Sequence, residues 1–361
     1  MSLINSDELL NKMKNLPIKT ALCSFGMSGS VFHAPFIFTN PKFNLYGVLE
    51  RTKNRAREKY PSVKTFPTLE SMLADENIEL VVVNTPNITH CNFAKQAIGA
   101  GKNVIVEKPF TTTVAEATEL IQLANKKKVT LSVYHNRRYD SDFRTVKKIL
   151  DEGWLGRIVE AEIHFDRYVP KLSLKAHKET QTIGVGNLYD LGSHLIDQSL
   201  QLFGLPLSIY ANLGIYRPDS KVVDYFDLKL IYASGMVTLK SSYFVREPLP
   251  AFIFHGTKGS FIKTRSDVQE SDLQAGKMPN SSNWGIEPKD GMGLLHTEKD
   301  GIIIKKSIPS LNGDYMDYYE GIYEAIRNNK PIPVSATEGR EVIRVIEAAI
   351  KSNEEKREID L

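Results

Sequence analysis

The sequence is poor in cysteine, with only two in 361 residues. Neither Cys23 nor Cys91 has another cysteine or a histidine at metal-ligand spacing, so we expect two buried free thiols in a reducing, cytoplasmic compartment and no metal site. No apolar run approaches the roughly twenty residues that a membrane-spanning helix needs, which predicts no membrane association. Residues 1–8 lack a basic start followed by an apolar stretch, so we expect no signal peptide.

The sequence also lacks a strong charge of either sign. Its 46 basic and 43 acidic residues leave a formal net charge of +3, and no basic stripe is interleaved with aromatic residues. This pattern excludes a typical nucleic-acid partner. A hydrophobic content of 42% with 25% charged residues is typical of an ordinary globular protein, and the length indicates two domains.

In the first part of the chain, short β-branched runs alternate with segments of helical periodicity. This alternation predicts right-handed βαβ units and a parallel sheet. We expect strands at residues 20–24, 44–49, 80–84, 104–106 and 129–133, with helices that include 88–100 and 114–127.

The pattern changes after residue 139, where long strands follow one another with short turns. Such a run predicts a large, mostly antiparallel open sheet with one solvated face. We expect strands at 157–168, 207–214, 224–232, 236–244 and 251–254, and helices at 141–152, 188–203, 315–328 and 335–353. Residues 275–300 are rich in Gly, Pro, Asn and Ser, which favours an extended loop. The fold class is therefore α/β, with a dinucleotide-binding domain at 1–138 and an α+β domain at 139–361 whose last helices pack back on the first.

A glycine-rich turn follows the first expected strand and opens a helix. Gly26 and Gly29 occupy the second and third glycine positions of a dinucleotide-binding turn, while Ser24 stands at the first. Glycines there let the backbone approach a pyrophosphate that rests on the next helix's N-terminus. We interpret the turn as a cofactor site because of its place in the βαβ run; a glycine turn without function is the alternative.

The second expected strand ends in Glu50 and Arg51. The Glu50 carboxylate would accept hydrogen bonds from the adenosine ribose of NAD, whereas Arg51 and Lys53 would pair with the 2′-phosphate of NADP. A charge cluster that opens a helix is a third interpretation. The residues alone leave this choice open.

Lys108 follows another expected strand, at the edge where the carboxyl ends of parallel strands form a ligand crevice. Asp190 and His194 are one helical turn apart, and their apolar flanks argue against a simple surface ion pair. A cation, an acid and a titratable base are the groups needed to move a proton while a hydride leaves a carbon. His33 and His90 lie near the same edge without an identifiable partner, so we interpret them as supporting residues.

With these motifs the chain resembles the glucose-fructose oxidoreductase, inositol dehydrogenase and MocA-like family, and is most similar to its NADP-dependent scyllo-inositol 2-dehydrogenases. The resemblance rests on Gly26-Met27-Ser28-Gly29 with His33-Ala34-Pro35, Asn84-Thr85-Pro86, Glu107-Lys108-Pro109 and Asp190-Leu191-Gly192-Ser193-His194, and on residues 132–138, 166–168, 188–198, 255–263 and 312–315. It implies an N-terminal Rossmann domain, NADP or NAD as cofactor, a polyol or sugar as substrate, and a homo-oligomer, either a dimer or a tetramer.

The resemblance also implies roles for individual residues. The catalytic residues would be Lys108, Asp190 and His194, and these would bind the substrate together with Tyr168 and Tyr315. The cofactor would be bound by Gly26, Met27, Ser28, Gly29, Glu50, Arg51, Thr85, Pro86, His90, Glu107 and Asn136. Two departures matter: Ser24 replaces the usual first glycine, and residues 175–178 differ where close relatives are expected to have an Arg-Trp pair beside the nicotinamide and substrate.

The expected reaction is hydride transfer between nicotinamide C4 and a secondary ring hydroxyl, most simply that of scyllo-inositol. His194 would take the hydroxyl proton, Asp190 would orient the imidazole and favour its protonated form, and Lys108 would stabilise the developing alkoxide. Two alternatives are a dehydrogenase of aldoses or sugar derivatives on the same scaffold, and a regulator that binds dinucleotide or sugar without turnover.

Overall fold

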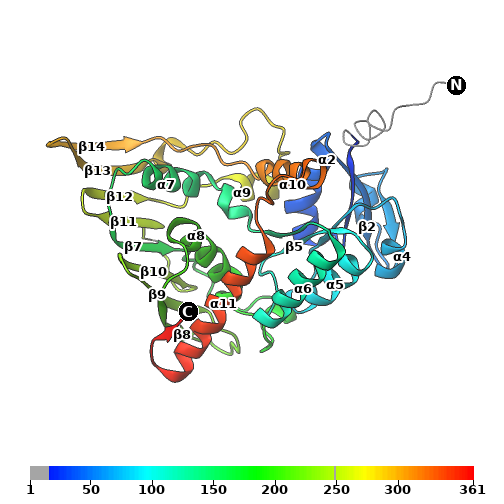
Figure 1. The fold of residues 1–361 in the computed structure, drawn as a ribbon, viewed down its shortest axis with the longest axis horizontal. Coiled ribbons are helices and arrows are strands. Elements are labelled where there is room, and N and C mark those ends of the chain that lie inside the picture. Colours follow the sequence, from blue (N-terminus) through cyan, green and yellow to red (C-terminus); the bar gives the residue numbers. More distant parts are fainter. Residues whose placement is uncertain (1–15, 248) are drawn as a thin grey trace.

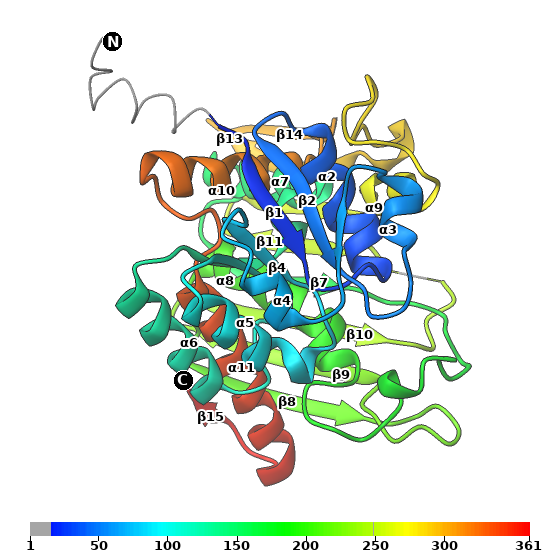
Figure 2. The same ribbon diagram turned by 90° about the vertical axis from the view of Figure 1, so that its right-hand side faces the viewer.

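The computed structural model contains two sheets joined by helices (Figures 1 and 2). The structure describes residues 16–247 and 249–361, apart from the side chain of His177. Residues 1–8, for which the sequence predicts no signal peptide, lie outside this range. Within it, no helix is long and apolar enough to cross a membrane.

The first sheet is parallel and six-stranded, in the order β3-β2-β1-β4-β5-β6. Its central strand β4 is buried along its whole length, as expected for a sheet covered on both faces. This confirms the predicted dinucleotide-binding architecture. The strands are β1 (Ile18–Leu22), β2 (Phe43–Leu49), β3 (Lys64–Phe66), β4 (Leu80–Val83), β5 (Asn103–Glu107) and β6 (Leu131–Tyr134).

Helices α5 and α6 pack against each other beside this sheet (Figure 2). Helix α6 begins at a capping box, in which the Thr113 side chain accepts a hydrogen bond from the Glu116 backbone N–H, and it ends at Lys128 in a left-handed conformation. The helices of this part are α2 (Ala34–Thr39), α3 (Arg55–Lys59), α4 (Leu69–Leu73), α5 (His90–Gly99) and α6 (Val114–Lys127), with the short turns η1 (Ser28–His33), η2 (Asn87–Thr89) and η3 (Asn136–Tyr139).

The second sheet is nine-stranded, in the order β14-β13-β12-β11-β7-β10-β9-β8-β15. Only β7 and β10 pair in parallel, so the prediction of a mostly antiparallel sheet is confirmed. The strands are β7 (Ile158–His164), β8 (Ser208–Gly214), β9 (Tyr225–Tyr232), β10 (Gly235–Ser242), β11 (Phe252–Gly256), β12 (Gly259–Lys263), β13 (Gly293–Lys299), β14 (Ile302–Ile308) and β15 (Ile359–Asp360).

Helices α7, α8 and α11 contribute to the same hydrophobic core as the inner face of this sheet. Along β9, buried Phe226, Leu228 and Leu230 alternate with less buried neighbours, which is typical of a sheet that packs on one face only. The remaining helices are α7 (Ser141–Asp151), α8 (Ser193–Phe203), α9 (Gln269–Gln274), α10 (Met316–Asn328) and α11 (Ala336–Glu355), with the short turns η4 (Ala176–Lys178), η5 (Leu188–Gly192) and η6 (Lys289–Gly291).

The C-terminal helices connect the two halves. Tyr318 and Tyr319 of α10 are fully buried in the core of the first sheet, where the Tyr319 ring stacks on Phe36 with centroids 5.8 Å apart. Helix α11 contacts α6 on one side and β8 on the other. The division of the chain at residue 138 stays a prediction.

The structure corrects the expected loop at 275–300, because β13 begins at Gly293 within it. Strands β3, β12, β14 and β15 were not predicted either. Strands β13 and β14 lie at the edge of the sheet, and their outward residues are mostly exposed. The polar and glycine-rich composition before Gly293 concealed β13, which is stabilised by pairing with β12 on one side and β14 on the other.

Candidate active site

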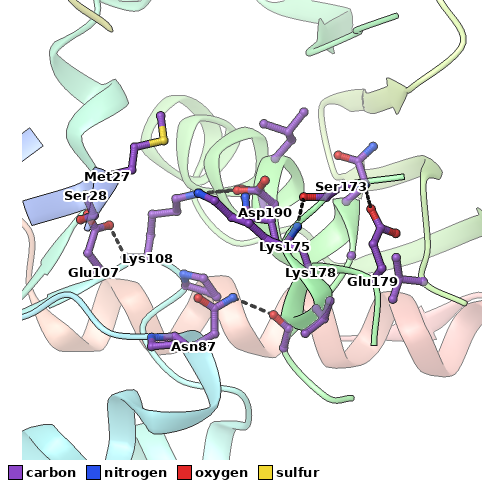
Figure 3. Close-up of a pocket in the computed structure, with 18 of the residues that line it drawn as sticks. Met27, Ser28, Asn87, Glu107, Lys108, Ser173, Lys175, Lys178, Glu179 and Asp190 are labelled. Carbon is purple, nitrogen blue, oxygen red and sulfur yellow. Dashed lines mark hydrogen bonds and ion pairs between the residues drawn. The ribbon is translucent and has the colours of Figure 1, made fainter. Parts of the chain in front are cut away.

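A cavity of about 990 Å³ lies between the carboxyl ends of β1, β4 and β5 and the segment 167–194 (Figure 3). One wall includes Ser24–Ser28, Asn84–Pro86 and Glu107–Pro109, which follow parallel strands; we call it the strand-end wall. The opposite wall is formed largely by residues 167–187, and we call it the loop wall.

The two glycines of the turn have different surroundings: Gly26 lines the cavity, whereas Gly29, also predicted to bind the cofactor, does not. A Cβ atom on Gly29 would lie 2.2 Å from the Ser24 carbonyl oxygen and 2.7 Å from Asn84 Nδ2, so this position has no room for a side chain. A Cβ atom on Gly26 would meet only Ser24 Oγ, at 3.5 Å. Gly29 therefore lets the turn pack against the sheet, whereas Gly26 leaves the backbone open to the cavity.

Ser24, which replaces the usual first glycine, stabilises the turn. Its hydroxyl accepts a hydrogen bond from the Gly26 backbone N–H at 3.2 Å, and its carbonyl accepts one from Asn84 Nδ2 at 2.9 Å. Asn84 lines the cavity, and its Oδ1 is buried without a hydrogen-bond partner among the described residues. Together with the helical segment that begins at Ser28, these groups fit a dinucleotide.

Glu107 lies in the strand-end wall and has two partners. The Ser28 hydroxyl donates to Glu107 Oε1, and His33 Nε2 lies 3.0 Å from the same oxygen. Burial alone would raise the pKa of Glu107, but His33, Ser28 and Lys108 outweigh it and lower the pKa to about 2. His33 in turn contacts the Tyr319 hydroxyl at 2.6 Å, a partner in α10 that the sequence did not indicate.

His90 holds the ends of two strands together. Its Nδ1 lies 2.9 Å from the Pro109 carbonyl oxygen, and its Nε2 lies 2.9 Å from the Thr85 carbonyl oxygen. Burial lowers the pKa of this imidazole. Thr85, Pro86, His90 and Asn136, which were all predicted to bind the cofactor, line the cavity.

Lys108 and Asp190 meet at the centre of the cavity (Figure 3). Lys108 Nζ donates to Asp190 Oδ1 at 2.7 Å and to the Asp190 carbonyl oxygen at 3.1 Å. The positive charge of Lys108 holds the pKa of Asp190 well below its usual range. The pair connects the end of β5 to the turn η5, so it joins two segments that are far apart in the sequence.

His194 lies in the first turn of α8 and lines the same cavity. Its Nδ1 is buried and has no hydrogen-bond partner within the part of the chain that the structure describes. Burial, and after it the charges of Lys108 and Arg137, lower the pKa of His194 well below its ordinary value. The structure differs from the expectation that Asp190 favours the protonated imidazole, because Asp190 pairs with Lys108 and the pKa of His194 is lowered instead of raised.

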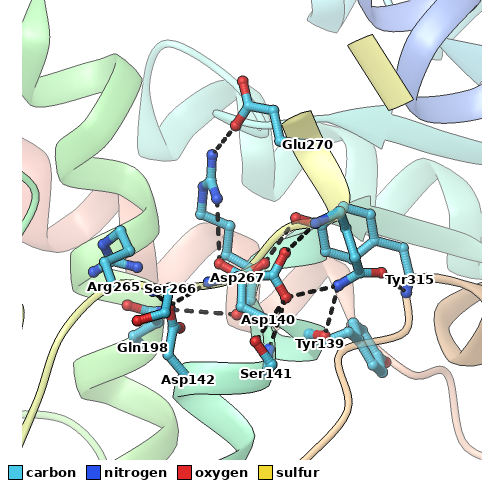
Figure 4. A network of polar contacts seen from close by, with 12 residues as sticks. Tyr139, Asp140, Ser141, Asp142, Gln198, Arg265, Ser266, Asp267, Glu270 and Tyr315 are labelled. Atoms are coloured by element: carbon cyan, nitrogen blue, oxygen red, sulfur yellow. Dashed lines mark hydrogen bonds and ion pairs between the residues drawn. The ribbon is translucent and has the colours of Figure 1, made fainter. Parts of the chain in front are cut away.

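Two residues predicted to bind substrate lie elsewhere. Tyr315 is fully buried and donates its hydroxyl hydrogen to Asp140 Oδ1 at 2.7 Å (Figure 4), and neither of these two residues lines the cavity. Tyr168 is 45% exposed, with the guanidinium of Arg246 3.9 Å from its ring centroid. Both corrections have the same cause: a tyrosine close to a motif in sequence can point away from the site.

Glu50 and Arg51 also lie outside the cavity. One Glu50 carboxylate oxygen accepts a hydrogen bond from the Ala56 backbone N–H at 3.1 Å, and Arg51 is exposed. They follow β2, the neighbour of β1 in the parallel sheet.

The sequence prediction missed most of the loop wall. Its residues come from an irregular segment without strand or helix periodicity, and the only signal was the departure noted at 175–178. One ion pair links this region to another segment, between Glu179 and Arg217 at 3.0 Å. A second ion pair in the cavity lining joins Arg137 to Glu270 at 2.5 Å. The missed residues that line the cavity include Arg137, Arg167, Lys171, Lys175, Lys178, Glu179, Asn187, Arg217 and Glu270. No cluster of potential metal ligands occurs among the described residues.

The two halves of the chain match two parts of one family. Residues 18–135 match the NAD-binding Rossmann fold of the oxidoreductase family, and residues 147–361 match its C-terminal alpha/beta domain. The chain therefore belongs to the GFO/IDH/MocA family of oxidoreductases, and the resemblance seen in the sequence is confirmed. The fold and the glycine turn thus define a nicotinamide-dinucleotide-dependent oxidoreductase.

Individual relatives are similar over nearly the whole chain. The scyllo-inositol 2-dehydrogenase (NADP(+)) IolW of Bacillus subtilis is 40% identical over 344 residues, which cover 95% of this chain and 96% of that protein. A solved oxidoreductase from Bacteroides fragilis is 47% identical with a TM-score of 0.87, covering 96% of this chain and 100% of that one. The oxidoreductase yvaA from Bacillus subtilis is 39% identical with a TM-score of 0.91, covering 96% and 98%.

Proposed function

We propose that the protein is an NADP-dependent dehydrogenase that oxidises a secondary ring hydroxyl of a cyclitol or sugar, with scyllo-inositol as the first substrate to test. The observation that carries this proposal is the placement of Lys108, Asp190 and His194 in the cavity that the glycine turn also lines. A dinucleotide on the strand-end wall and a polyol beside His194 would then share one enclosed space.

The three residues have distinct tasks in this reaction. His194, held neutral by burial and by neighbouring positive charge, accepts the hydroxyl proton. A bound nicotinamide would supply the hydride acceptor, so that the same carbon would lose a hydride and the alcohol, two electrons and two hydrogens poorer, would become a ketone. Lys108 donates a hydrogen bond to the oxygen on which negative charge develops, and Asp190 fixes the Lys108 ammonium in position.

The surroundings of Glu50 support NADP as the cofactor. The carboxylate of Glu50 already accepts a hydrogen bond from the backbone of α3, whereas the exposed Arg51 beside it is free to meet a 2′-phosphate. IolW, the relative from Bacillus subtilis, carries NADP in its name. The sequence left open whether the cofactor is NAD or NADP, and we propose NADP.

A dehydrogenase of a sugar derivative is the second candidate. The D-glucoside 3-dehydrogenase of Escherichia coli is 27% identical over 199 residues, which cover 54% of this chain and 56% of that protein. Both candidates use the same acid-base residues on the same scaffold, so only substrate turnover distinguishes them.

The test is nicotinamide reduction by the purified protein with scyllo-inositol, myo-inositol, glucose and a methyl glucoside, each with NADP and with NAD. We expect NADP-dependent turnover that is fastest with scyllo-inositol among these neutral compounds. Faster turnover of the glucoside would favour the second candidate. Tight cofactor binding with no turnover of any ring alcohol would instead indicate a non-catalytic regulator and contradict the proposal.

We also propose that the chain forms a homo-oligomer through the outer face of the nine-stranded sheet. Tyr210, Leu294 and Ile303 point outward from β8, β13 and β14 and are 41%, 39% and 73% exposed. Apolar residues on an open sheet face favour burial against a second copy. Light scattering after size exclusion tests this, since a monomer at micromolar concentration would contradict it.

A further inference from the structure

The charges that line the cavity are unbalanced. Seven lysine or arginine side chains face four carboxylates in the lining. The polyols proposed above carry no charge. Lys171, Lys175 and Lys178 are exposed to the solvent of the cavity, so this excess of positive charge is available to a charged ligand.

Each of the four carboxylates already has a partner. Asp190 pairs with Lys108 at 2.7 Å, and Glu107 pairs with His33 at 3.0 Å. The other two form the ion pairs with arginine described above, Glu179 with Arg217 and Glu270 with Arg137. Lys108, Arg217 and Arg137 thus pair with three of the four carboxylates, and Glu107 contacts His33, which leaves the rest of the basic lining without a carboxylate partner.

Four cations remain, and all of them belong to the loop wall. Arg167, Lys171, Lys175 and Lys178 have no carboxylate within ion-pair distance in residues 16–247 and 249–361. Figure 3 shows Lys175 and Lys178 beside Asp190, across the cavity from Met27 and Ser28 of the glycine turn. After Lys108, the charges of Lys178 and Arg167 also lower the pKa of Asp190, which indicates that they act at the reactive end.

Buried polar atoms without partners occur in the same region. Asn187 Oδ1, Arg137 Nε and His194 Nδ1 are buried and lack a hydrogen-bond partner in the described chain, although all three residues line the cavity. A buried polar atom is costly unless a ligand or water satisfies it. The four cations of the loop wall therefore favour a negatively charged ligand, whereas a buried acceptor such as Asn187 Oδ1 calls for a hydrogen-bond donor.

We infer that the substrate carries an anionic group, a carboxylate or a phosphate, which the loop-wall cations Lys175 and Lys178 bind while the ring hydroxyl lies at Lys108 and His194. This inference rests on the proposed function and narrows its substrate class to acidic sugars or cyclitols and their phosphate esters. The cofactor's pyrophosphate does not account for these cations, because the glycine turn that would hold it lies on the opposite wall.

The experiment compares matched pairs of neutral and anionic substrates with NADP: glucose with glucuronate, glucose with glucose 6-phosphate, and myo-inositol with an inositol monophosphate. We expect kcat/KM to be about tenfold or more higher for the anionic member of at least one pair, which corresponds to one charge-assisted hydrogen bond. The pair that shows the preference distinguishes a carboxylate from a phosphate. The preference should shrink as salt is added, because screening weakens partly exposed charges.

The variants Lys175→Gln and Lys178→Gln test the residues themselves. In each, the ratio of kcat/KM for the anionic substrate to that for its neutral partner should fall by about tenfold. Lys126→Gln is the matched control, since Lys126 is an exposed lysine at the end of α6 that does not line the cavity. It should leave the ratio unchanged.

Binding of the same anions to the NADP complex, measured by calorimetry, separates the possible failures. The inference would be overturned, and the proposed function left intact, if the wild-type protein preferred the neutral substrates and the lysine variants had the same ratio of kcat/KM values. The inference would also be overturned if the lysine variants bound NADP more weakly but kept the same ratio of kcat/KM values, because the lysines would then bind the cofactor and not the substrate. If the protein turns over none of these compounds, the proposed function fails. The inference is then tested by calorimetry alone, and it would be overturned if the anions bound both lysine variants as tightly as the wild-type protein.

Discussion

The two walls of the cavity differ in how completely their polar groups are paired. On the strand-end wall, Glu107 is bound by Ser28 and His33, and His90 lies between two backbone carbonyl oxygens. On the loop wall, Lys175 and Lys178 have no carboxylate partner in the described residues. One wall is therefore organised before any ligand binds, whereas the other still has charge to be neutralised.

This difference matches the two ligands that a dehydrogenase must bind. The dinucleotide is common to the whole family, so a rigid, internally paired wall suits it. The substrate differs among relatives, and the irregular segment 167–187 can change without disturbing either sheet. Lys108, Asp190 and His194 lie between the walls, where the fixed part of the site meets the variable part.

The largest expected effect comes from removing the residue that joins the walls. In Lys108→Ala, we expect kcat to fall by about a thousandfold, because the developing alkoxide loses its hydrogen-bond donor. NADP affinity should stay close to that of the wild-type protein, since the strand-end wall keeps its own pairs. Steady-state kinetics and a fluorescence titration with NADPH measure the two effects. Equal losses in turnover and cofactor affinity would show that the walls are not separate.

His194→Asn should lower kcat by about a hundredfold and remove the acidic limb of the pH profile. In the wild-type protein, the pKa of His194 is depressed, so the neutral base persists below the ordinary histidine pKa of about 6.5. The rate of alcohol oxidation should consequently fall only below that pH. An acidic limb above pH 7, or one that survives the substitution, would contradict the role of His194 as the base.

Substitutions of Gly26 and Gly29 separate cofactor binding at the strand-end wall from the stability of the turn. Gly26→Ala should weaken NADP binding by about tenfold without lowering thermal stability, because its Cβ atom meets only Ser24 Oγ and projects where the cofactor approaches. Gly29→Ala serves as the contrast, with an expected loss of about 2 kcal/mol in the free energy of unfolding, since its Cβ atom would overlap the Ser24 carbonyl oxygen. Cofactor titrations and chemical denaturation check both. Unchanged cofactor affinity in Gly26→Ala would place the dinucleotide elsewhere.

The smallest effect on catalysis is expected from Arg51, which lies outside the cavity. Arg51→Gln should raise the KM for NADP several-fold and leave the KM for NAD unchanged, because only NADP offers the 2′-phosphate that Arg51 would meet. Lys126→Gln, at an exposed lysine far from β2 in sequence and outside the cavity lining, is a control for general loss of charge. A similar change with both cofactors would argue against Arg51 as the residue that selects NADP.

The strand-end wall could be predicted from the sequence, and the loop wall could not. Gly26, Thr85, Glu107 and Lys108 follow buried β-branched strands, and the carboxyl ends of such strands meet at one edge of a parallel sheet. Residues 167–187 have no periodicity, so no sequence rule places Lys178 beside Asp190.

The hydrogen-bond and ion-pair partners of individual side chains could not be predicted from the sequence either. The spacing of Asp190 and His194 suggested a direct interaction between them, but Lys108 approaches from β5 and takes the carboxylate. Tyr315 seemed a substrate contact by its motif, yet Asp140 binds its hydroxyl inside the core. Such contacts depend on which of several possible partners the tertiary structure brings closest, and local patterns do not contain that information.

The central claim is that hydride passes between a ring carbon and nicotinamide inside the cavity that the two walls form. The most direct measurement uses a substrate deuterated at the reacting carbon and follows the label into the reduced cofactor by mass spectrometry. We predict that NADPH carries the deuterium in the wild-type protein and that Lys108→Ala almost abolishes the transfer. Oxidation of the substrate with no deuterium in the cofactor, or undiminished transfer in the variant, would contradict the account.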